Sequence, residues 1–319
     1  MARDEEGISH TPVLLAQVLS ALDVQPGGVY LDATFGRGGH AGAILSKLSA
    51  DGRLLCLDRD PAAIESAAAK FAPDPRVSVF HAEFSELAAC IDQGRPGLRC
   101  DGILFDLGVS SPQLDDAQRG FSFMQDGPLD MRMNAGRGAS AADVVNTASE
   151  GELARIFIQL GEEKFAKRIA RAIVADRGAQ PFRTTLQLAQ MIARVAPTRE
   201  LHKHPATRVF QALRIHVNRE LEELQLGLRA AVSRLNVGGR LAVISCHSLE
   251  DRIVKHFLRE QSSVDPMYAG LPDIPAHVRP SLRLVGRSIE PEQIEIDRNP
   301  RARSARLRVA QRLPQQLAA

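Results

Sequence analysis

The chain has 319 residues, of which 44% are hydrophobic and 24% charged, and its formal net charge is +2. This composition is typical of a globular protein, and the length exceeds that of a usual domain, so we expect one large domain with an insertion or two domains. No apolar run approaches the ~18 residues of a membrane helix, and the acidic start, MARDEEGISH, lacks the apolar core of a secretory signal. We therefore expect a cytoplasmic protein without a membrane partner.

Two features bear on metal binding and redox state. The four cysteines are scattered without a C-x-x-C pair, at Cys56, Cys90, Cys100 and Cys246. This spacing favours reduced thiols over disulfides or a zinc site. The HKH segment at 202–204 offers two histidines without further clustered ligands, which is more typical of loop histidines than of a metal site. We expect no bound metal.

The first third of the chain alternates short apolar runs with amphipathic segments. The runs predict buried strands at 28–34, 52–58, 76–82 and 101–108. The segments between them predict helices at 40–48, 61–71 and 84–91. This alternation predicts an α/β fold with a doubly wound, mostly parallel sheet and helices on both faces. Ligands bind such sheets at the carboxyl ends of the strands.

The middle of the chain reads as a helical insertion at 112–210. It begins in an irregular segment rich in Gly, Pro, Asp and Ser, which is too long for an ordinary connection and predicts a functional loop. Helical patterns follow at 149–161, 162–178 and 184–197. The spacing of Ser149 and Glu152 predicts a capping box at the first of them.

The chain then returns to the sheet, so that 1–111 and 211–319 are predicted to form one domain. Residues 206–235 predict a single long amphipathic helix. Two further strands are expected at 238–248 and 304–313. Between them, Ser248 and Asp251 predict the N-terminal cap of another helix.

The segment LDATFGRGGH at 31–40 predicts a ligand-binding loop after the first strand. It contains Asp32, the glycines Gly36, Gly38 and Gly39, and His40. Glycines allow the backbone to approach a ligand, and a helix that begins near His40 offers free N–H groups. The G-x-G-x-x-A match at 36–41 also occurs in nicotinamide-dependent dehydrogenases, and a lone match is weak.

Two acids separate these cofactor classes. Asp58, at the end of the second strand, is placed to accept hydrogen bonds from ribose hydroxyls, which nicotinamide cofactors and S-adenosylmethionine share. Asp32 would repel a pyrophosphate, but it would attract the α-amino group of a methionine moiety. The pair therefore favours S-adenosylmethionine.

Eight longer segments carry a family resemblance: HTPVLL, DATFGRGGH, LDRDPAAI, DLGVSSPQLDDAQRGFSFMQDGPLDMRM, GEEKFAKRIARAI, HPATRVFQALRIHVNRELEEL, ISCHSLEDRIVKHF and NPRARSARLR. Through them the chain resembles the bacterial 16S ribosomal RNA cytosine-N4 methyltransferase family. The resemblance implies a class I, Rossmann-like methyltransferase fold whose helical insertion recognises the substrate. It also implies S-adenosylmethionine as donor, a decoding-region cytidine of 16S ribosomal RNA as acceptor, and a role in rRNA processing at the small ribosomal subunit.

The resemblance also implies a donor site and one departure from the family pattern. Carried over by motif, the donor site comprises Gly38, Gly39, His40, Asp58, Phe84, Asp106 and Gln113. We add Asp32 and Gly36 to the predicted donor site, because both belong to the glycine loop described above. Cys246 stands where we would expect Phe, a change that could alter packing but removes no obvious catalytic group.

Asp106 is the predicted catalytic residue. An exocyclic cytosine amine is a poor nucleophile, so a hydrogen-bond acceptor that faces one N–H would help to aim its lone pair at the methyl group. Asp106 and backbone carbonyls of the following loop are the candidates. A full general base is not required, because the methylated amine becomes cationic and loses its proton easily. The alternative is that Asp106 contacts only the donor or holds the loop.

Contacts to the RNA are predicted in three places. Asp130, Arg132, His247 and Ser248 are expected near the target base, although Asp130 and Arg132 could simply pair with each other. Arginines of the C-terminal segment could contact phosphate: Arg301, Arg303, Arg306 and Arg308. The insertion offers Lys164, Lys167, Arg168 and Arg171, which could equally form a solvated helix face.

Two rival functions remain open at this stage. One is a methyltransferase with another amine acceptor, such as DNA or a protein, and the other is an inactive RNA-binding ribosome-assembly factor. The sequence does not predict an oligomeric state.

Overall fold

The computed structural model describes residues 12–71, 73–196, 204–264, 266–268, 275 and 278–314. The chain divides into two compact units: Met1–Gly108 with Glu223–Ala319, the sheet unit, and Val109–Glu222, the helical unit. From the sequence we placed these limits at 111/112 and 210/211. Among the described residues, no helix combines the length and apolar character needed to cross a membrane.

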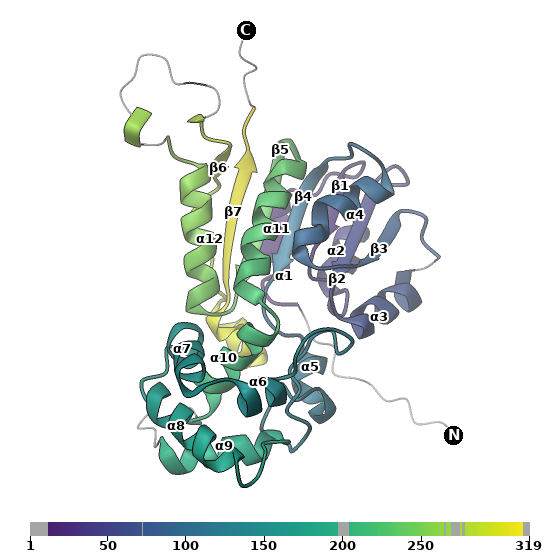
Figure 1. Ribbon diagram of the computed structural model, residues 1–319. Helices are drawn as coiled ribbons and strands as arrows, with labels where there is room; N and C mark the ends of the chain where they lie inside the picture. Colours follow the sequence, from purple (N-terminus) through teal and green to yellow (C-terminus); the bar gives the residue numbers. More distant parts are fainter. Residues whose placement is uncertain are drawn as a thin grey trace, which may run out of the picture. The chain divides into compact units, whose positions relative to one another are not determined.

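Strands and helices alternate along the sheet unit, and helices fill most of the helical unit (Figure 1). The described elements are α1 (Leu15–Leu22), β1 (Val29–Asp32), α2 (Gly39–Leu45), β2 (Arg53–Asp58), α3 (Pro61–Phe71), β3 (Val77–His81), η1 (Phe84–Glu86), α4 (Leu87–Gly94), β4 (Cys100–Asp106), α5 (Ser111–Asp115), η2 (Ala117–Arg119), α6 (Ala141–Thr147), α7 (Glu150–Gly161), α8 (Ala166–Arg177), α9 (Thr185–Val195), α10 (Thr207–Val217), α11 (Glu220–Arg234), β5 (Leu235–Ser245), α12 (Ser248–Gln261), η3 (Pro266–Tyr268), β6 (Leu282–Leu284), α13 (Gln293–Arg298), η5 (Pro300–Ser304) and β7 (Arg306–Arg312).

The described strands form one seven-stranded sheet with the order β3-β2-β1-β4-β5-β7-β6. Strands β1 to β5 are parallel, whereas β7 is antiparallel to both β5 and β6. The strand order reverses between β1 and β4, which is the switch point where such sheets bind ligands. All six predicted strands are confirmed. Strand β6 was not predicted, because its three residues are too few for a periodic signal.

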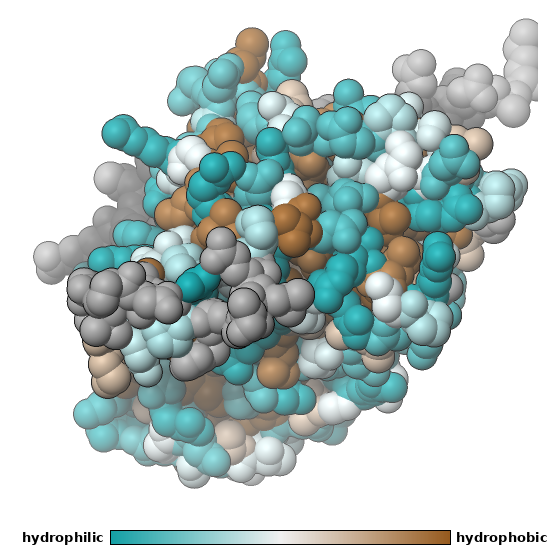
Figure 2. Space-filling view, turned by 90° about the horizontal axis from the view of Figure 1, so that it is seen from above, coloured by the Kyte–Doolittle hydropathy of each residue, from teal (hydrophilic) through white to brown (hydrophobic). Residues whose placement is uncertain are grey.

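Each face of the sheet has its own hydrophobic core. Leu241 and Val243 of β5 pack into a core with α4, α11 and α12, while Ala242 and Ile244 join the core formed with α1, α2 and α3. This alternation follows from the period of two in a strand. On the face seen in Figure 2, hydrophobic residues lie in small groups between hydrophilic side chains.

The helical unit has a separate core built by α6 to α10. Close packing of α7 and α10 requires glycine, since a Cβ atom at Gly161 would lie 2.5 Å from the carbonyl oxygen of Arg208. The predicted capping box of Ser149 and Glu152 is confirmed at the start of α7. His202 of the HKH segment lies outside the described residues, and His204 accepts a hydrogen bond from the Ala206 N–H.

The prediction of one helix over 206–235 is wrong, because the chain breaks between α10 and α11. Asn218 ends α10, and Arg219 adopts a left-handed φ of 49°. The Asn218 amide donates to the Met131 carbonyl and accepts from the Met133 N–H, each at 2.7 Å. The helical pattern continues through this point in the sequence. The break follows from a side chain that binds a distant loop.

Candidate active site

Three acids lie at the carboxyl ends of neighbouring parallel strands. Asp32 ends β1, Asp58 ends β2 and Asp106 ends β4. The register pairs Asp32 with Cys56 and with Leu104, so all three strands finish at one edge of the sheet. This edge contains the β1/β4 switch point, and it is therefore the expected ligand site.

The glycine loop follows β1 and fixes the backbone beside these acids. Gly36 donates its N–H to Asp58 Oδ2 at 2.8 Å, which ties the loop to the end of β2. Gly38 adopts φ 73°, and a Cβ atom there would lie 2.5 Å from the Phe35 ring. Only glycine tolerates both this positive φ and the lack of space for a Cβ atom. The loop leads directly into α2, which begins at Gly39.

Asp32 is a buried carboxylate with an unused oxygen. Its Oδ1 accepts the Thr34 N–H at 3.1 Å, whereas Oδ2 has no hydrogen-bond partner among the described residues. The residue is only 1% exposed. Burial, partly offset by the nearby His40, raises the pKa of Asp32 to about 6. A buried acceptor of this kind is costly unless a ligand satisfies it, and perturbed carboxyls mark functional sites.

His40 and Asp106 lie close together at this edge. His40 Nε2 lies 3.5 Å from Asp106 Oδ2, and the imidazole is buried whereas the carboxyl remains partly exposed. Burial opposes the charged imidazole, but the Asp106 carboxylate, followed by that of Asp32, raises the pKa of His40 above its ordinary value. The Asp106 N–H donates to Thr34 Oγ1 at 2.6 Å, so the end of β4 is tied to the loop after β1.

Asp58 is held rigidly but keeps acceptor capacity. Oδ2 accepts from Gly36, and Oδ1 accepts the Asp60 N–H at 2.9 Å. Burial raises the pKa of Asp58, and these backbone hydrogen bonds oppose the rise. Each carboxylate oxygen has two lone pairs, so both can still accept a hydroxyl.

Phe84 provides an apolar surface just after β3. Its ring packs edge to face on Phe105, with centroids 5.1 Å apart, and it remains partly exposed. The preceding Glu83 forms a capping box with Glu86 at η1. Helix α11 passes close to this ring, since a Cβ atom at Gly227 would lie 2.6 Å from Phe84 Cβ. The ring position is therefore set by packing.

The segment after β5 lies at the same edge, because Asp106 pairs with Ile244 in the sheet register. Glu250, which is 3% exposed, accepts the Cys246 N–H at 2.8 Å, and its Oε1 lies 3.2 Å from His247 Nε2. Cys246 Sγ donates to the Leu107 carbonyl at 3.0 Å. The residue that departs from the family pattern thus connects the segments that follow β4 and β5.

Ser248 was predicted to cap α12, and this assignment is wrong. His247 is the N-cap, and its Nδ1 accepts the Glu250 N–H at 3.4 Å. Ser248 is the first residue of the helix, one position too late to serve as its cap. Asp251 pairs with Arg308, at 2.8 Å from its Nε, so it belongs to the contact between α12 and β7.

Three predicted site residues belong to the helical unit. Gln113 is buried and its Oε1 accepts the Ser110 N–H at 2.9 Å, which completes a capping box at α5. Asp130 and Arg132 form a two-pronged ion pair at 2.9 and 2.7 Å. Burial alone would raise the Asp130 pKa, but the Arg132 guanidinium holds that pKa below its ordinary value. Pairing with each other was the alternative that we kept open from the sequence.

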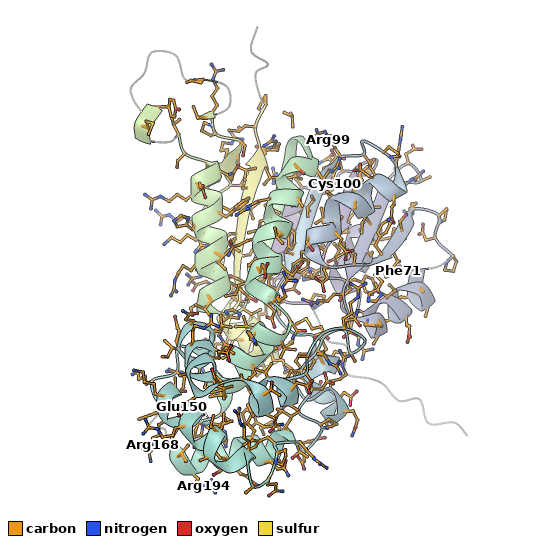
Figure 3. All side chains as sticks on the ribbon, in the orientation of Figure 1. Phe71, Arg99, Cys100, Glu150, Arg168 and Arg194 are labelled. Carbon is orange, nitrogen blue, oxygen red and sulfur yellow. The ribbon has the colours of Figure 1, made fainter. Side chains whose placement is uncertain are left out.

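The predicted phosphate-binding cations have different surroundings. Arg301 and Arg303 are exposed on η5. Arg306 and Arg308 both pair with Asp251, and Arg306 also pairs with Glu290, so their charge is already opposed. In the helical unit, Lys164, Lys167, Arg168 and Arg171 are exposed, and Figure 3 shows Arg168 extending outward from α8.

The residues of the sheet edge fit S-adenosylmethionine. The unused Asp32 Oδ2 matches an α-ammonium group, and Asp58 retains acceptor sites for the two ribose hydroxyls. Phe84 offers an apolar surface to the adenine ring. The open backbone of the Gly36–Gly38 turn allows close approach.

Two residues of this edge were missed from the sequence. Thr34 holds the Asp106 backbone, and Glu250 organises the segment after β5. The position of Thr34 was a signal in the sequence, because polar side chains two residues after an Asp often form hydrogen bonds within the loop. Glu250 sits in an ordinary helical pattern, and only the fold shows that it is buried.

The strand order 3-2-1-4-5-7-6, with β7 running against its neighbours and acids at the ends of β1, β2 and β4, defines a class I methyltransferase fold. The sequence pattern of the MraW methylase family matches residues 7–313. The chain belongs to this family, and the resemblance seen in the sequence motifs is confirmed.

One relative and two solved structures illustrate the range of similarity. The chain is 53% identical over 306 residues to ribosomal RNA small subunit methyltransferase H of Idiomarina loihiensis, which covers 95% of this chain and 97% of the relative. An rRNA methylase of Streptococcus thermophilus is 10% identical, covering 97% and 100% of the two chains, with a TM-score of 0.43. TrmN of Thermus thermophilus is 13% identical, covering 94% and 48%, with a TM-score of 0.42. Likeness as remote as that of the two structures supports no conclusion about substrate.

Proposed function

We propose that this protein transfers a methyl group from S-adenosylmethionine to the exocyclic N4 of a cytidine in 16S ribosomal RNA. The single observation that carries the proposal is the relative that is 53% identical over 95% of the chain and is named a small-subunit rRNA methyltransferase. The acids at the β1, β2 and β4 ends, of which Asp32 is buried, support the same donor chemistry independently. The finer proposal is that the cytidine lies in the decoding region and that the enzyme acts in the cytoplasm on the small ribosomal subunit.

The donor is held by complementary charge and shape. Asp32 accepts from the α-ammonium group, Asp58 from the ribose hydroxyls, and Phe84 packs beside the adenine. Gly36, Gly38 and Gly39 keep the loop backbone close, and we also assign Gln113 and His40 to this site, as the family motifs imply. The bound donor supplies a methyl group activated by a positively charged sulfur.

Asp106 aims the acceptor amine. The cytosine N4 lone pair is delocalised into the ring, so a carboxylate that accepts one N–H favours the geometry in which the lone pair points at the methyl carbon. With the donor bound, its methyl group would pass from the sulfur to N4, and the sulfur would be released as a neutral thioether. The amine then carries one extra proton, which passes to Asp106 or to water.

His40 acts on Asp106 as a positioning residue. Its Nε2 lies 3.5 Å from Asp106 Oδ2, and Thr34 holds the Asp106 backbone from the other side. The buried imidazole favours a carboxylate orientation that keeps Oδ2 beside Nε2. The Asp106 side chain remains partly exposed, so the arriving target base can reach it.

The RNA contacts follow from the need to extrude the base. A stacked cytosine hides its amine within base pairing, so the target must leave its stack to meet the donor. His247 and Ser248 at the start of α12 are assigned to the extruded base, together with Asp130 and Arg132 of the helical unit. The exposed Arg301 and Arg303 are assigned to phosphates.

The proposal is tested by methyl transfer from radiolabelled S-adenosylmethionine to unmethylated small subunits and to naked 16S rRNA, followed by nucleoside analysis. We expect N4-methylcytidine at one decoding-region position. Methylation of DNA or protein instead would support another acceptor. Donor and RNA binding without any transfer would support an inactive assembly factor, and either result would refute the proposal.

Asp106→Ala separates the catalytic role from donor binding. We expect kcat to fall by about 100-fold, in the range seen for general acid–base groups, with a smaller loss of donor affinity measured by calorimetry. Asp106→Asn is the matched variant, because it keeps the shape but weakens the acceptor. Asp106→Ala could instead lower donor affinity and the rate at subsaturating donor by the same factor, with a normal kcat at saturating donor. That result would show that Asp106 serves the donor alone.

A further inference from the structure

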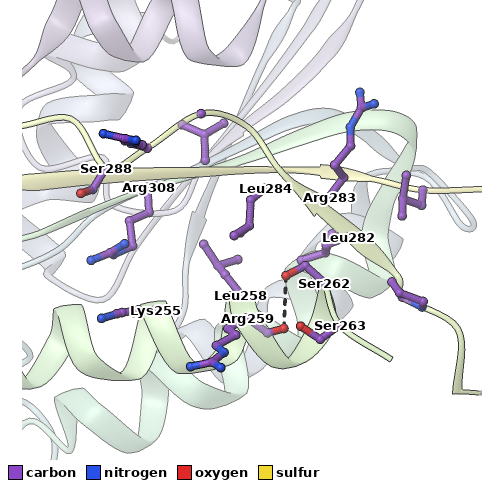
Figure 4. Close-up of a pocket in the computed structure, with 15 residues that line it drawn as sticks. Lys255, Leu258, Arg259, Ser262, Ser263, Leu282, Arg283, Leu284, Ser288 and Arg308 are labelled. Atoms are coloured by element: carbon purple, nitrogen blue, oxygen red, sulfur yellow. Dashed lines mark hydrogen bonds between the residues drawn. The ribbon is translucent and has the colours of Figure 1, made fainter. Parts of the chain in front are cut away.

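A second hollow of the sheet unit lies away from the acid-lined edge, between α12 and the β6–β7 pair. It has a volume of about 890 Å³, and Figure 4 shows Leu258 of α12 and Leu284 of β6 pointing toward each other across it. We call it the α12–β7 cavity. Its size lies near the upper end of ligand pockets, which span roughly 300 to 1,000 Å³.

The lining of this cavity is strongly basic. Its described residues include five cations and no Asp or Glu, the cations being Lys255, Arg259, Arg283, Arg287 and Arg308. Lys255 and Arg308 extend toward the same end of the cavity, whereas Arg283 points away from it (Figure 4). The cations come from α12, from β6 with the residues that follow it, and from β7.

Three of these cations have no acidic partner among the described residues. Arg308 is neutralised by Asp251, and Arg283 donates to the Gln311 side chain at 2.6 Å. By contrast, Lys255, Arg259 and Arg287 are exposed and take part in none of the ion pairs found in the described parts of the chain. Their charge is therefore available to an external anion.

The floor of the cavity is apolar and the rim carries hydroxyls. Leu258, Leu282 and Val309 are buried, while Leu284 is 49% exposed. Ser263 and Ser288 stand at the rim. A phosphodiester chain that carries flat, partly apolar bases suits this arrangement, since its phosphates pair with the cations and its bases cover the leucines.

We propose that the α12–β7 cavity binds a single-stranded segment of the ribosomal RNA substrate outside the methylated nucleotide. Lys255, Arg259 and Arg287 contact its phosphates, and Leu258 with Leu284 contacts its riboses and bases. This inference rests on the proposed function for the identity of the RNA. The N-cap of α12, His247, lies at the acid-lined edge, so one helix connects the base-binding segment to the cavity.

The test replaces the three unpaired cations by glutamine, as Lys255→Gln/Arg259→Gln/Arg287→Gln. A matched control removes the same charge from exposed residues of the sheet unit that do not line the cavity, as Lys47→Gln/Arg95→Gln/Arg229→Gln. Binding to naked 16S rRNA is measured by filter retention over a range of KCl concentrations. Donor affinity, measured by calorimetry, reports whether each variant is folded.

We expect the cavity variant to bind the donor normally, whereas its RNA binding should depend less steeply on salt concentration. The slope of log K against log salt should fall by about 2, because each of three phosphate contacts contributes about 0.7 on single strands. The RNA affinity near physiological salt should fall roughly 10- to 100-fold. KM for RNA should rise with kcat unchanged.

Two outcomes would overturn the inference. A slope equal to that of the control variant would show that the cavity does not contact phosphates. Weaker binding to assembled subunits with unchanged binding to naked RNA would indicate an acidic protein partner instead. If wild-type enzyme binds RNA through these cations but methylates no cytidine N4, the cavity assignment stands and the proposed function fails.

Discussion

The acid-lined edge of the sheet unit and the helical unit differ in whether their acidic side chains form ion pairs within the protein. In the helical unit, Asp130 pairs with Arg132 through two hydrogen bonds, and the half-buried Arg214 pairs with Glu220 in the same manner. In the sheet unit, Asp32 is more deeply buried than any of these groups, but no group in the described parts of the chain pairs with its Oδ2. The charges of the helical-unit pairs are neutralised within the protein, whereas the Asp32 oxygen is left for the ligand that we propose.

Replacing Asp32 tests this comparison with the largest expected effect. Asp32→Asn keeps the hydrogen bond to Thr34 but removes the negative charge. We expect donor affinity to fall about 100-fold, since a hydrogen bond between charged groups contributes about 1.5 to 3 kcal/mol. Stability at pH 7 should instead rise by about 2 kcal/mol, because the raised pKa reports a carboxylate that is costly to ionise.

Calorimetry of donor binding and urea unfolding of the unbound protein measure the two effects. Asp60→Asn serves as a control, because Asp60 is also buried but its Oδ1 accepts the Ala62 N–H within the loop. A loss of both stability and affinity in Asp32→Asn would show that Asp32 is a structural residue.

The pH dependence of donor binding gives a second test, with a smaller effect. Because the pKa of Asp32 is raised to about 6, the ionised fraction falls below that pH, and donor affinity should drop about tenfold by about pH 5. The folding stability of the unbound protein depends on pH in the opposite direction. Between the unfolded pKa and 6 the folded state binds more protons, so this residue's contribution favours folding as pH falls and is lost as pH rises through 6.

Titration calorimetry over pH 5 to 8 with wild type and Asp32→Asn checks this prediction. The wild type should show the tenfold change that the variant lacks. Identical pH profiles for the two proteins would assign the titration to another group, such as His40.

The smallest expected effect concerns the helical unit. Asp130→Asn leaves Arg132 without its partner, and we expect a loss of about 1 kcal/mol in stability, as for a partly exposed ion pair. Donor affinity should not change. Urea unfolding and calorimetry measure both quantities.

The same variant distinguishes the two roles that we kept for Asp130. A fall in kcat for RNA that exceeds the loss of folded protein would assign Asp130 to the target base. Normal turnover would leave it as half of a structural pair.

Much of the fold was predictable because its signals are local. The apolar runs that became β1 to β5 and β7 are each flanked by polar or turn residues, and α3 begins and ends where Pro61 and Phe71 predicted. The errors share a cause. Asn218 breaks the predicted long helix through hydrogen bonds to the Met131–Met133 loop, and His247 takes the cap that Ser248 was given.

The sequence also located the acids of the candidate site. Asp32, Asp58 and Asp106 each end an apolar run, and in a parallel sheet those ends meet at one edge. The sequence did not predict which of these carboxylates has its hydrogen bonds completed within the protein. Asp58 has two backbone donors from segments around it, whereas Asp32 has one unused oxygen, and this depends on how the loop folds.

The sequence by itself determined the family, the alternating α/β pattern and the positions of the site acids, because these depend on motifs and on periodicity along the chain. The tertiary structure alone decided the ionisation of Asp32, the pairing of His40 with Asp106 and the unpaired cations of the α12–β7 cavity. Burial and charge pairing depend on groups distant in sequence, since the dielectric surroundings of a side chain exist only after the chain has folded.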